Sequence, residues 1–181
     1  MILITHGHFD HSASAPDILA ASKKNCKLIC IYEVGEYYKT VSKCNPDAIM
    51  QMNKSGTADL GWCKVTMVNA DHSSGCPMAD GHIFDGGAPA GFVIRFPSSD
   101  VSIYHMGDTG IFLDMQLIDE LYKPTHLMMP IGGNFTMGPE EAAHACMFFK
   151  HARAVLPMHF GTFPLLPGTF ADFKDFVGKK N

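Results

Sequence analysis

Thr5-His6-Gly7-His8-Phe9-Asp10-His11 is the most informative segment of this chain. It directly follows the apolar run Met1–Ile4, which predicts a short buried strand that ends as the segment begins. In an extended loop, His6, His8 and Asp10 share parity and are expected to point the same way. Imidazole and carboxylate groups are ligands of first-row metals and favour zinc over cations that bind oxygen alone. The segment therefore predicts a metal site rather than a loop that binds metals adventitiously.

Two further residues of the segment have separate parts in this interpretation. Gly7 has no Cβ, so the backbone can bend closely around whatever the neighbouring imidazoles hold. His11 breaks the parity of the other ligands and enters the next turn. We therefore expect His11 to serve a neighbouring site rather than the same one.

Composition limits the class of protein. The chain has 181 residues, enough for a single domain over residues 1–181 with a buried core. Its net charge is −4 and its Lys and Arg residues are scattered, which argues against a nucleic-acid partner. The chain has no run of about 18 apolar residues and no charged-then-apolar leader, so we expect no membrane span and no secretory signal. Six cysteines without CxxC spacing favour reduced thiols and a cytoplasmic location.

Short apolar runs alternate with segments of helical periodicity, and this rhythm predicts a layered α/β protein. After the first strand, strands are expected over residues 26–32, 48–52, 64–68, 92–96, 101–105, 126–131 and 154–158. Helices are expected over residues 14–24, 35–43, 111–122 and 170–177, and another begins at residue 139. Residues 73–87 predict an irregular loop, either a lip for substrate or an ordinary surface loop.

Further motifs accompany the opening segment in sequence order. They are Ala70-Asp71-His72-Ser73-Ser74, Ala88-Pro89-Ala90-Gly91, Tyr104-His105-Met106-Gly107-Asp108-Thr109, Pro130-Ile131-Gly132-Gly133-Asn134-Phe135-Thr136-Met137-Gly138-Pro139 and Pro157-Met158-His159-Phe160. Together with the opening HxHxDH pattern, they resemble the metallo-β-lactamase superfamily. Within it, the chain is similar to small metal-dependent hydrolases related to L-ascorbate-6-phosphate lactonase. The resemblance implies a four-layer αββα sandwich of the α/β class.

The resemblance also implies how the ligands divide between two metal ions. One set would be His6, His8 and His72, and the other Asp10, His11 and His159. Asp108 would bridge the two ions, which requires them to lie about 3.5–4 Å apart. Such a pair lowers the pKa of a shared water, and the carboxylates of Asp10 and Asp108 offset charge and orient the resulting hydroxide. Imidazole at position 8 makes zinc the expected metal, with manganese, iron or nickel as alternatives.

Three further residues are candidate substrate contacts. His82 lies in the 73–87 loop and is a candidate catalytic or substrate-binding group. Asn134 and Thr136 follow a strand beside the expected site, where they would hydrogen-bond substrate or equally brace their own loop. His105 precedes Asp108 by three positions, so on a strand it faces the other way and is expected to be structural.

The leading functional hypothesis is a hydrolase of a small ester, lactone or phosphoester. One alternative is a phosphodiesterase acting on nucleic acid or phospholipid, and another is a metal-binding scaffold whose catalysis has been lost. A redox enzyme is a more distant alternative.

Other members of the family that the chain resembles carry several strands ahead of the HxHxDH loop, whereas this chain starts on the last of them. The chain is therefore expected to lack part of one sheet, by truncation or as a naturally shortened form. The uncovered sheet edge predicts a homo-oligomer.

Overall fold

The structure is a computed structural model that describes residues 1–22 and 25–180. Its smaller main sheet is parallel and has the strand order β1-β2-β3. The strands are β1 (Ile2–Leu3), β2 (Leu28–Ile31) and β3 (Ile49–Met52). Helix α2 (Ala15–Ala21) lies between the first two strands in sequence, and α3 (Tyr32–Thr40) between the last two. Parallel neighbours need such crossovers, which explains the βαβαβ order.

The larger sheet has six strands in the order β11-β10-β9-β8-β5-β4. These are β4 (Thr57–Asp59), β5 (Lys64–Asn69), β8 (Ala90–Arg95), β9 (Ser102–His105), β10 (His126–Pro130) and β11 (Ala154–Met158). The pairs from β4 to β9 are antiparallel, and β9, β10 and β11 run parallel. Helices α4 (Met115–Tyr122) and α5 (Pro139–Cys146) connect the parallel strands, and α6 (Phe170–Lys180) follows the last.

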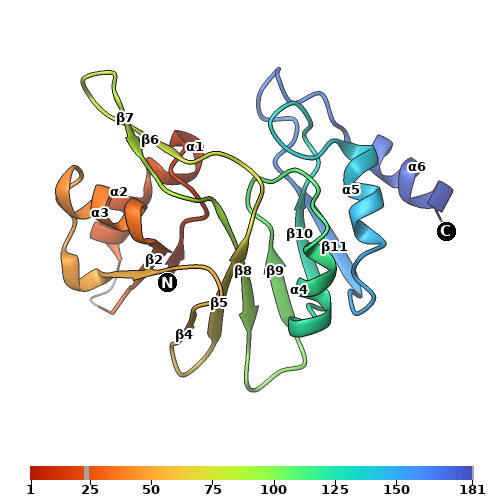
Figure 1. Cartoon of the computed structure of the whole chain (residues 1–181), viewed down its shortest axis with the longest axis horizontal. Helices are drawn as coiled ribbons and strands as arrows, with labels where there is room; N and C mark the ends of the chain where they lie inside the picture. The colour runs from red at the N-terminus through yellow and green to blue at the C-terminus, as the bar shows by residue number, and fades with distance from the viewer. Residues whose placement is uncertain (23–24, 181) are drawn as a thin grey trace.

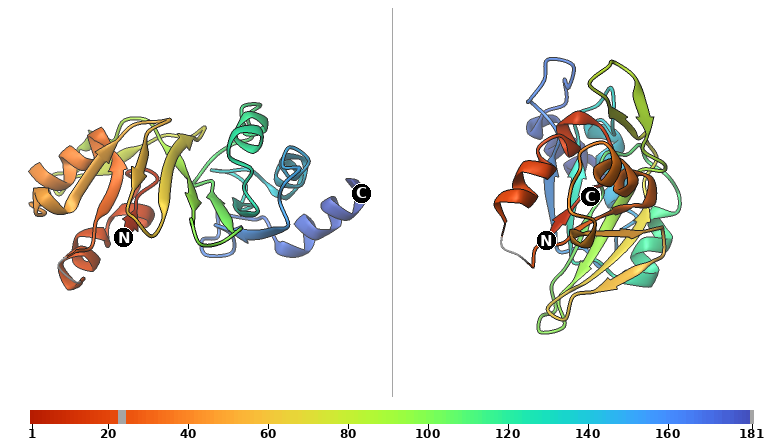
Figure 2. Two further views of the ribbon diagram at one scale, coloured as in Figure 1. Left: turned by 90° about the horizontal axis from the view of Figure 1, so that it is seen from below. Right: turned by 90° about the vertical axis from the view of Figure 1, so that its left-hand side faces the viewer.

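Two cores hold these layers together. One core contains residues of both main sheets and of α3, while the other lies between the large sheet and helices α4, α5 and α6. Successive side chains of strand β8 point to opposite faces of the sheet, so the strand contributes to both cores: Phe92 packs in the first and Val93 in the second. The order of layers is therefore helix, sheet, sheet, helix, as predicted, and Figure 2 shows helices outside the strands on both sides.

Two short elements complete the end of the molecule where the motifs gather. Helix α1 (Phe9–Ser12) follows the first two histidines, and the hairpin β6 (Gly75–Pro77) and β7 (Ile83–Asp85) projects above it. A turn of 3-10 helix, η1 (Pro46–Ala48), precedes β3. Within the described residues, no helix is both long and apolar enough to cross a membrane.

The structure refines several predicted boundaries. Residues 73–87 hold the β6–β7 hairpin rather than an irregular loop, and β4 was not predicted. Helix α3 begins at Tyr32, ahead of the predicted residue 35. Helix α4 begins only at Met115, later than the predicted residue 111. The predicted end of the first helix, at residue 24, lies outside the described residues.

Candidate metal centre

Strand direction explains why distant motifs meet. Strand β5 is antiparallel to β8, which is antiparallel to β9, so β5 runs in the same direction as β9, β10 and β11. The carboxyl ends of these strands share one edge of the sheet. Three chemically active side chains follow β5, β9 and β11 at this edge: His72, Asp108 and His159. The chain leaving β1 brings the opening histidines to the same place.

The first group of ligand-type side chains is His6, His8 and His72, whose ligand atoms all lie within 4.8 Å of one another. The ring centroids are 4.6 Å apart for His6 and His8, 5.0 Å for His6 and His72, and 5.1 Å for His8 and His72. His6 Nε2 and His8 Nδ1 are 3.1 Å apart. Three imidazoles at this separation match the donor set of a tetrahedral zinc site with one open position.

The second group is Asp10, His11 and His159, again with ligand atoms within 4.8 Å of one another. The rings of His11 and His159 stack with centroids 5.2 Å apart and an angle of 19°. The Asp10 Oδ2 atom lies 3.3 Å from His11 Nε2 and 3.5 Å from His159 Nε2. Asp10 and His11 both come from α1, where Ser12 Oγ donates to the Gly7 carbonyl across 2.8 Å.

Asp108 lies between the two groups. Its Oδ2 atom is 3.1 Å from His159 Nε2, 3.3 Å from His11 Nε2 and 3.8 Å from His72 Nε2. His6, His11 and Asp108 form a third set of mutually close ligand atoms. One carboxylate therefore faces imidazoles of both groups, which is the position that a bridging ligand needs.

Unpaired polar atoms show whether metal ions fit this arrangement. Four buried atoms of the cluster make no hydrogen bond of good geometry: His11 Nε2, Asp108 Oδ1, His159 Nδ1 and His159 Nε2. The two Nε2 atoms do lie 3.1–3.5 Å from carboxylate oxygens of Asp10 and Asp108. A buried polar group without a hydrogen-bond partner lowers the folding stability by about 1–3 kcal/mol, so several such groups seldom occur side by side. All four belong to residue types that ligate first-row metals. The donor set therefore fits a pair of divalent cations.

The surroundings set the charge of these groups. Burial, followed by the charge of His11, lowers the pKa of His6 to about 2, so His6 is neutral near pH 7 and has a free lone pair. Burial also lowers the pKa of His11, but the neighbouring Asp108 and Asp10 carboxylates outweigh it and the net pKa is raised. For Asp108, burial raises the pKa, but His11, His159 and His6 together bring it below its usual value. Asp108 is thus ionised.

Local backbone geometry holds the ligands in place. Thr5 Oγ1 lies 2.9 Å from His6 Nδ1, which leaves Nε2 facing the cluster. His159 has a φ of +54°, a left-handed conformation that is uncommon for residues with a side chain. A Cβ on Gly132 would lie 2.2 Å from the His159 carbonyl oxygen, so glycine is what allows this approach. His105 accepts a hydrogen bond from Gly107 N–H at 3.1 Å, in keeping with a structural role.

A pocket of about 810 Å³ opens beside the cluster, a volume within the range of small-molecule sites. Its lining includes five ligand candidates, His8, Asp10, His72, Asp108 and His159. The rest of the wall is mainly apolar: Phe9, Pro77, Ile83, Phe135, Phe163, Pro164, Leu165 and Leu166. The substrate lip considered for residues 73–87 supplies Pro77 and Ile83 of this wall. The other apolar residues were not predicted, although Phe9 and Phe135 stand inside the motifs and Phe163 shortly after the last one.

The three predicted substrate residues do not line this pocket. His82 is at the hairpin tip with its side chain 80% exposed, and its Nδ1 lies 3.2 Å from Asp80 Oδ2. Asn134 is exposed and has a φ of +57°. Thr136 is buried and its hydroxyl donates to the Met137 carbonyl at 3.3 Å. Of the three, Thr136 and His82 thus make contacts within their own loops, and none lies against the pocket.

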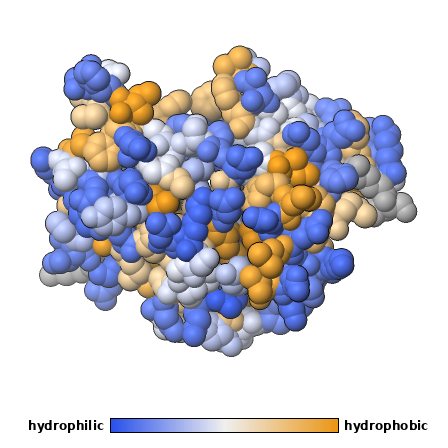
Figure 3. Space-filling model, viewed as in Figure 1, coloured by the Kyte–Doolittle hydropathy of each residue, from blue (hydrophilic) through white to orange (hydrophobic). Residues whose placement is uncertain are grey.

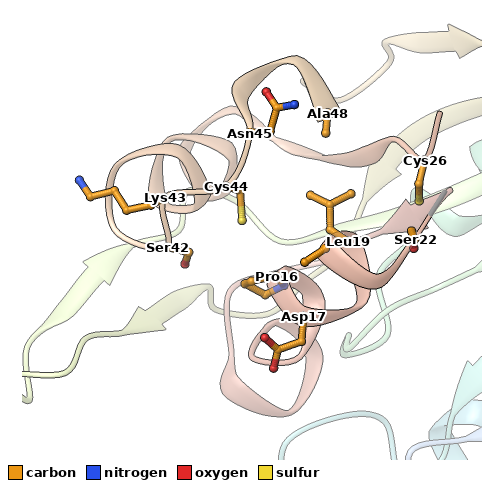
Figure 4. Close-up of a pocket in the computed structure, with 11 residues that line it drawn as sticks. Pro16, Asp17, Leu19, Ser22, Cys26, Ser42, Lys43, Cys44, Asn45 and Ala48 are labelled. Carbon is orange, nitrogen blue, oxygen red and sulfur yellow. The ribbon is translucent and has the colours of Figure 1, made fainter. Parts of the chain in front are cut away.

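A second pocket, of about 480 Å³, has no histidine in its lining (Figure 4). It is lined by Leu19 and other residues of α2, by Cys26 between α2 and β2, and by the segment that follows α3, including Cys44. None of the ligand candidates contributes to it. The chemistry of the chain is therefore concentrated at the first pocket.

The fold and the ligand cluster define a metallo-β-lactamase-fold protein, and comparisons with known proteins identify the family. The family model described as beta-lactamase superfamily domain matches residues 1–160. A UPF0173 metal-dependent hydrolase of Koribacter versatilis is 43% identical over 177 residues, covering 98% of this chain and 72% of that protein. The chain belongs to the beta-lactamase superfamily and, within it, to the UPF0173 metal-dependent hydrolases.

Solved structures agree with this assignment. Igni18, a metallo hydrolase from Ignicoccus hospitalis, superposes with a TM-score of 0.80 at 32% identity, covering 98% of this chain and 71% of that chain. YhfI of Bacillus subtilis, a metallo-beta-lactamase fold protein, has a TM-score of 0.67 at 12% identity over 98% of this chain and 70% of its own. The second likeness shows the fold alone. The chain is thus a metal-dependent hydrolase of the metallo-β-lactamase fold.

Proposed function

We propose that this chain holds two divalent cations, with zinc the expected metal, and hydrolyses a small ester, lactone or phosphoester. One observation carries the proposal. Asp108 Oδ2 lies 3.1–3.8 Å from nitrogens of His159, His11 and His72, while buried ligand atoms around it make no hydrogen bond of good geometry. Divalent cations would satisfy a cluster of imidazole and carboxylate groups of this kind.

Each of the two groups of side chains would bind one cation. His6, His8 and His72 would hold one cation, Asp10, His11 and His159 the other, and Asp108 would contact both. When bound, the cations lower the pKa of a shared water and polarise the electrophilic oxygen of the substrate. Asp10 and Asp108 offset part of the positive charge and orient the attacking water, and Asp10 lines the open pocket. Thr5 keeps His6 in one orientation.

We also propose a reducing, cytoplasmic location, which the six free cysteines support.

Elemental analysis together with hydrolysis assays tests the proposal. We expect about two zinc ions per chain and turnover of at least one member of a panel of esters, lactones and phosphodiesters. A chelator should abolish turnover, and zinc should restore it. A purified protein with two metals per chain that hydrolyses none of these bonds would instead support a scaffold role.

The bridging role of Asp108 predicts a sharp effect of one substitution. Asp108→Asn keeps the shape of the side chain but removes its charge, so we expect metal affinity to fall about 10–100-fold and turnover to fall at least about 100-fold. The measurements are metal stoichiometry and kcat. Asp175→Asn, on the exposed face of α6, is the matched control. Full metal content and turnover in Asp108→Asn would show that the bridging assignment is wrong.

A further inference from the structure

Apart from the ligand candidates, the side chains that line the pocket beside the ligand cluster are mainly apolar. Phe9, Ile83, Phe135, Phe163 and Leu165 line it, yet they are between 40% and 74% exposed. Exposed apolar side chains that gather into one patch commonly mark a binding site. Because the same pocket contains five ligand candidates, the patch and the metal centre share one cavity. The apolar wall therefore directly adjoins the candidate metal centre.

Separate segments of the chain build this wall. Ile83 comes from the β6–β7 hairpin, and Phe163 and Leu165 come from the segment after β11. These two segments project from the same end of the molecule in Figures 1 and 2, and Figure 3 shows apolar surface on both projections. Phe9 of α1 meets Phe163 edge to face, with ring centroids 6.4 Å apart. This contact joins the metal-binding helix to the wall.

The absence of Lys and Arg from the described pocket lining narrows the range of possible substrates. Among the described residues that line the pocket, none is Lys or Arg, and the histidines belong to the ligand groups. Phosphate groups are commonly recognised by Arg or Lys in addition to metal ions. A phosphoester would find no such partner on this wall, whereas an alkyl or aryl group would bury apolar surface against four or five side chains.

We propose that the substrate is an uncharged ester or lactone whose acyl part is an apolar chain or ring, seated against Phe9, Phe163 and Leu165. This inference rests on the proposed hydrolase function and names its substrate class. In the reaction the acyl C–O bond breaks and the carbonyl carbon bonds to the oxygen of one water. One proton of that water goes to the alcohol that leaves, and the other is released as the product acid ionises.

A chain-length series tests the substrate class. With the zinc-loaded protein, we expect kcat/KM for 4-nitrophenyl esters to rise about fourfold per added methylene from acetate towards octanoate, since each methylene is buried. Bis(4-nitrophenyl) phosphate should be hydrolysed at least about 100-fold less efficiently than the octanoate ester. A flat series, or a preference for the phosphodiester, would overturn this inference while leaving the hydrolase proposal intact. Hydrolysis of nothing in the series would overturn both.

A binding measurement gives a readout that does not depend on turnover. Linear carboxylates from acetate to octanoate are the acid products, and calorimetry on the zinc-loaded protein should show their affinity rising with chain length. Leu165→Lys should reduce the octanoate-to-acetate affinity ratio about tenfold or more. Leu121→Lys on α4, where Leu121 is 60% exposed and lies outside the pocket, is the matched control.

A second copy of the chain is the competing occupant of the apolar patch. In that case Leu165→Lys would change the oligomeric state in sedimentation, and octanoate would bind no better than acetate. Either result would overturn the assignment of the wall to substrate.

Discussion

At the scale of single residues, the position of His159 depends on a glycine in the facing strand end. A Cβ at Gly132 would lie 2.2 Å from the His159 carbonyl oxygen, and His159 already has a φ of +54°. We predict that Gly132→Ala displaces His159, lowers metal affinity about 10–100-fold and destabilises the fold by about 1–3 kcal/mol. Metal stoichiometry and thermal unfolding of the metal-free and loaded protein measure the two effects.

Gly178→Ala on α6 is the matched control, because a Cβ there would meet no atom within 4 Å. Equal metal content in the Gly132→Ala and Gly178→Ala variants would contradict a positioning role for Gly132.

His6 makes the stability of the metal-free protein depend on pH. Its folded pKa is about 2, whereas the unfolded value is 6.5, so the unfolded chain binds more protons between these values. The stability associated with neutral His6 is therefore complete above about pH 6.5 and is lost as the pH falls below it. From pH 6.5 to 5 the loss from this group is about 2 kcal/mol.

The contribution of His6 is isolated by comparing how steeply the free energy of unfolding changes with pH in two proteins. Chemical unfolding of the metal-free protein at several pH values should show a weaker loss of stability on acidification in His6→Gln than in the unmodified chain. His11 opposes the trend, because its folded pKa is raised and its contribution grows as the pH falls. The same slope in both proteins would contradict a buried neutral His6. His82→Gln, at an exposed position, controls for the loss of any histidine.

At the scale of secondary-structure elements, the hairpin β6–β7 depends on a close contact beside α1. A Cβ on Gly7 would lie 2.4 Å from Cys76 Sγ and 3.1 Å from Cys76 N, so glycine is needed for β6 to pack here. We predict that Gly7→Ala destabilises the protein by about 1–3 kcal/mol. Cys76→Ala in the same chain should recover part of this loss, because it removes the sulfur but not the backbone nitrogen.

Chemical unfolding of the two single variants and the double variant gives the coupling energy. Strict additivity of the two changes would show that the Gly7–Cys76 contact does not limit packing.

At the scale of the whole molecule, strand β1 leaves one edge of the smaller sheet unpaired among the described residues. Ile2 N–H and Ile4 N–H donate to carbonyls of Lys27 and Ile29, so strand alternation points Leu3 N–H away from β2. We propose that two copies pair through this edge. Sedimentation at high protein concentration should then show self-association, and Leu3→Pro should weaken it about tenfold by removing an outward donor.

A monomer at every concentration would contradict this pairing. Thermal unfolding of Leu3→Pro at low concentration shows whether the variant keeps the monomer fold.

Pattern along the chain was sufficient to predict the α/β layers and to single out His6, His8, Asp10 and His11 as candidate metal ligands. The reason is that alternation and residue spacing are local properties, as in β8, which alternates between two cores. His72, Asp108 and His159 each follow a strand, but the resemblance to known hydrolases was needed to interpret them as ligands. The resemblance to known hydrolases supplied the division into two ligand groups, and the structure brings those same groups together. The ions themselves remain a proposal.

Other features arise from contacts between segments that are distant in sequence. The β6–β7 hairpin is held by Tyr37 of α3, whose hydroxyl donates to the Pro77 carbonyl across 2.8 Å, and no local pattern records that bond. The apolar wall likewise joins α1, the hairpin and the segment after β11. Periodicity along one segment indicates which residues that segment buries. Which residues line a cavity depends instead on which segments face each other in the folded chain. For that reason the candidate metal ligands could be identified from the sequence, whereas the apolar character of the pocket beside them became apparent only in the tertiary structure.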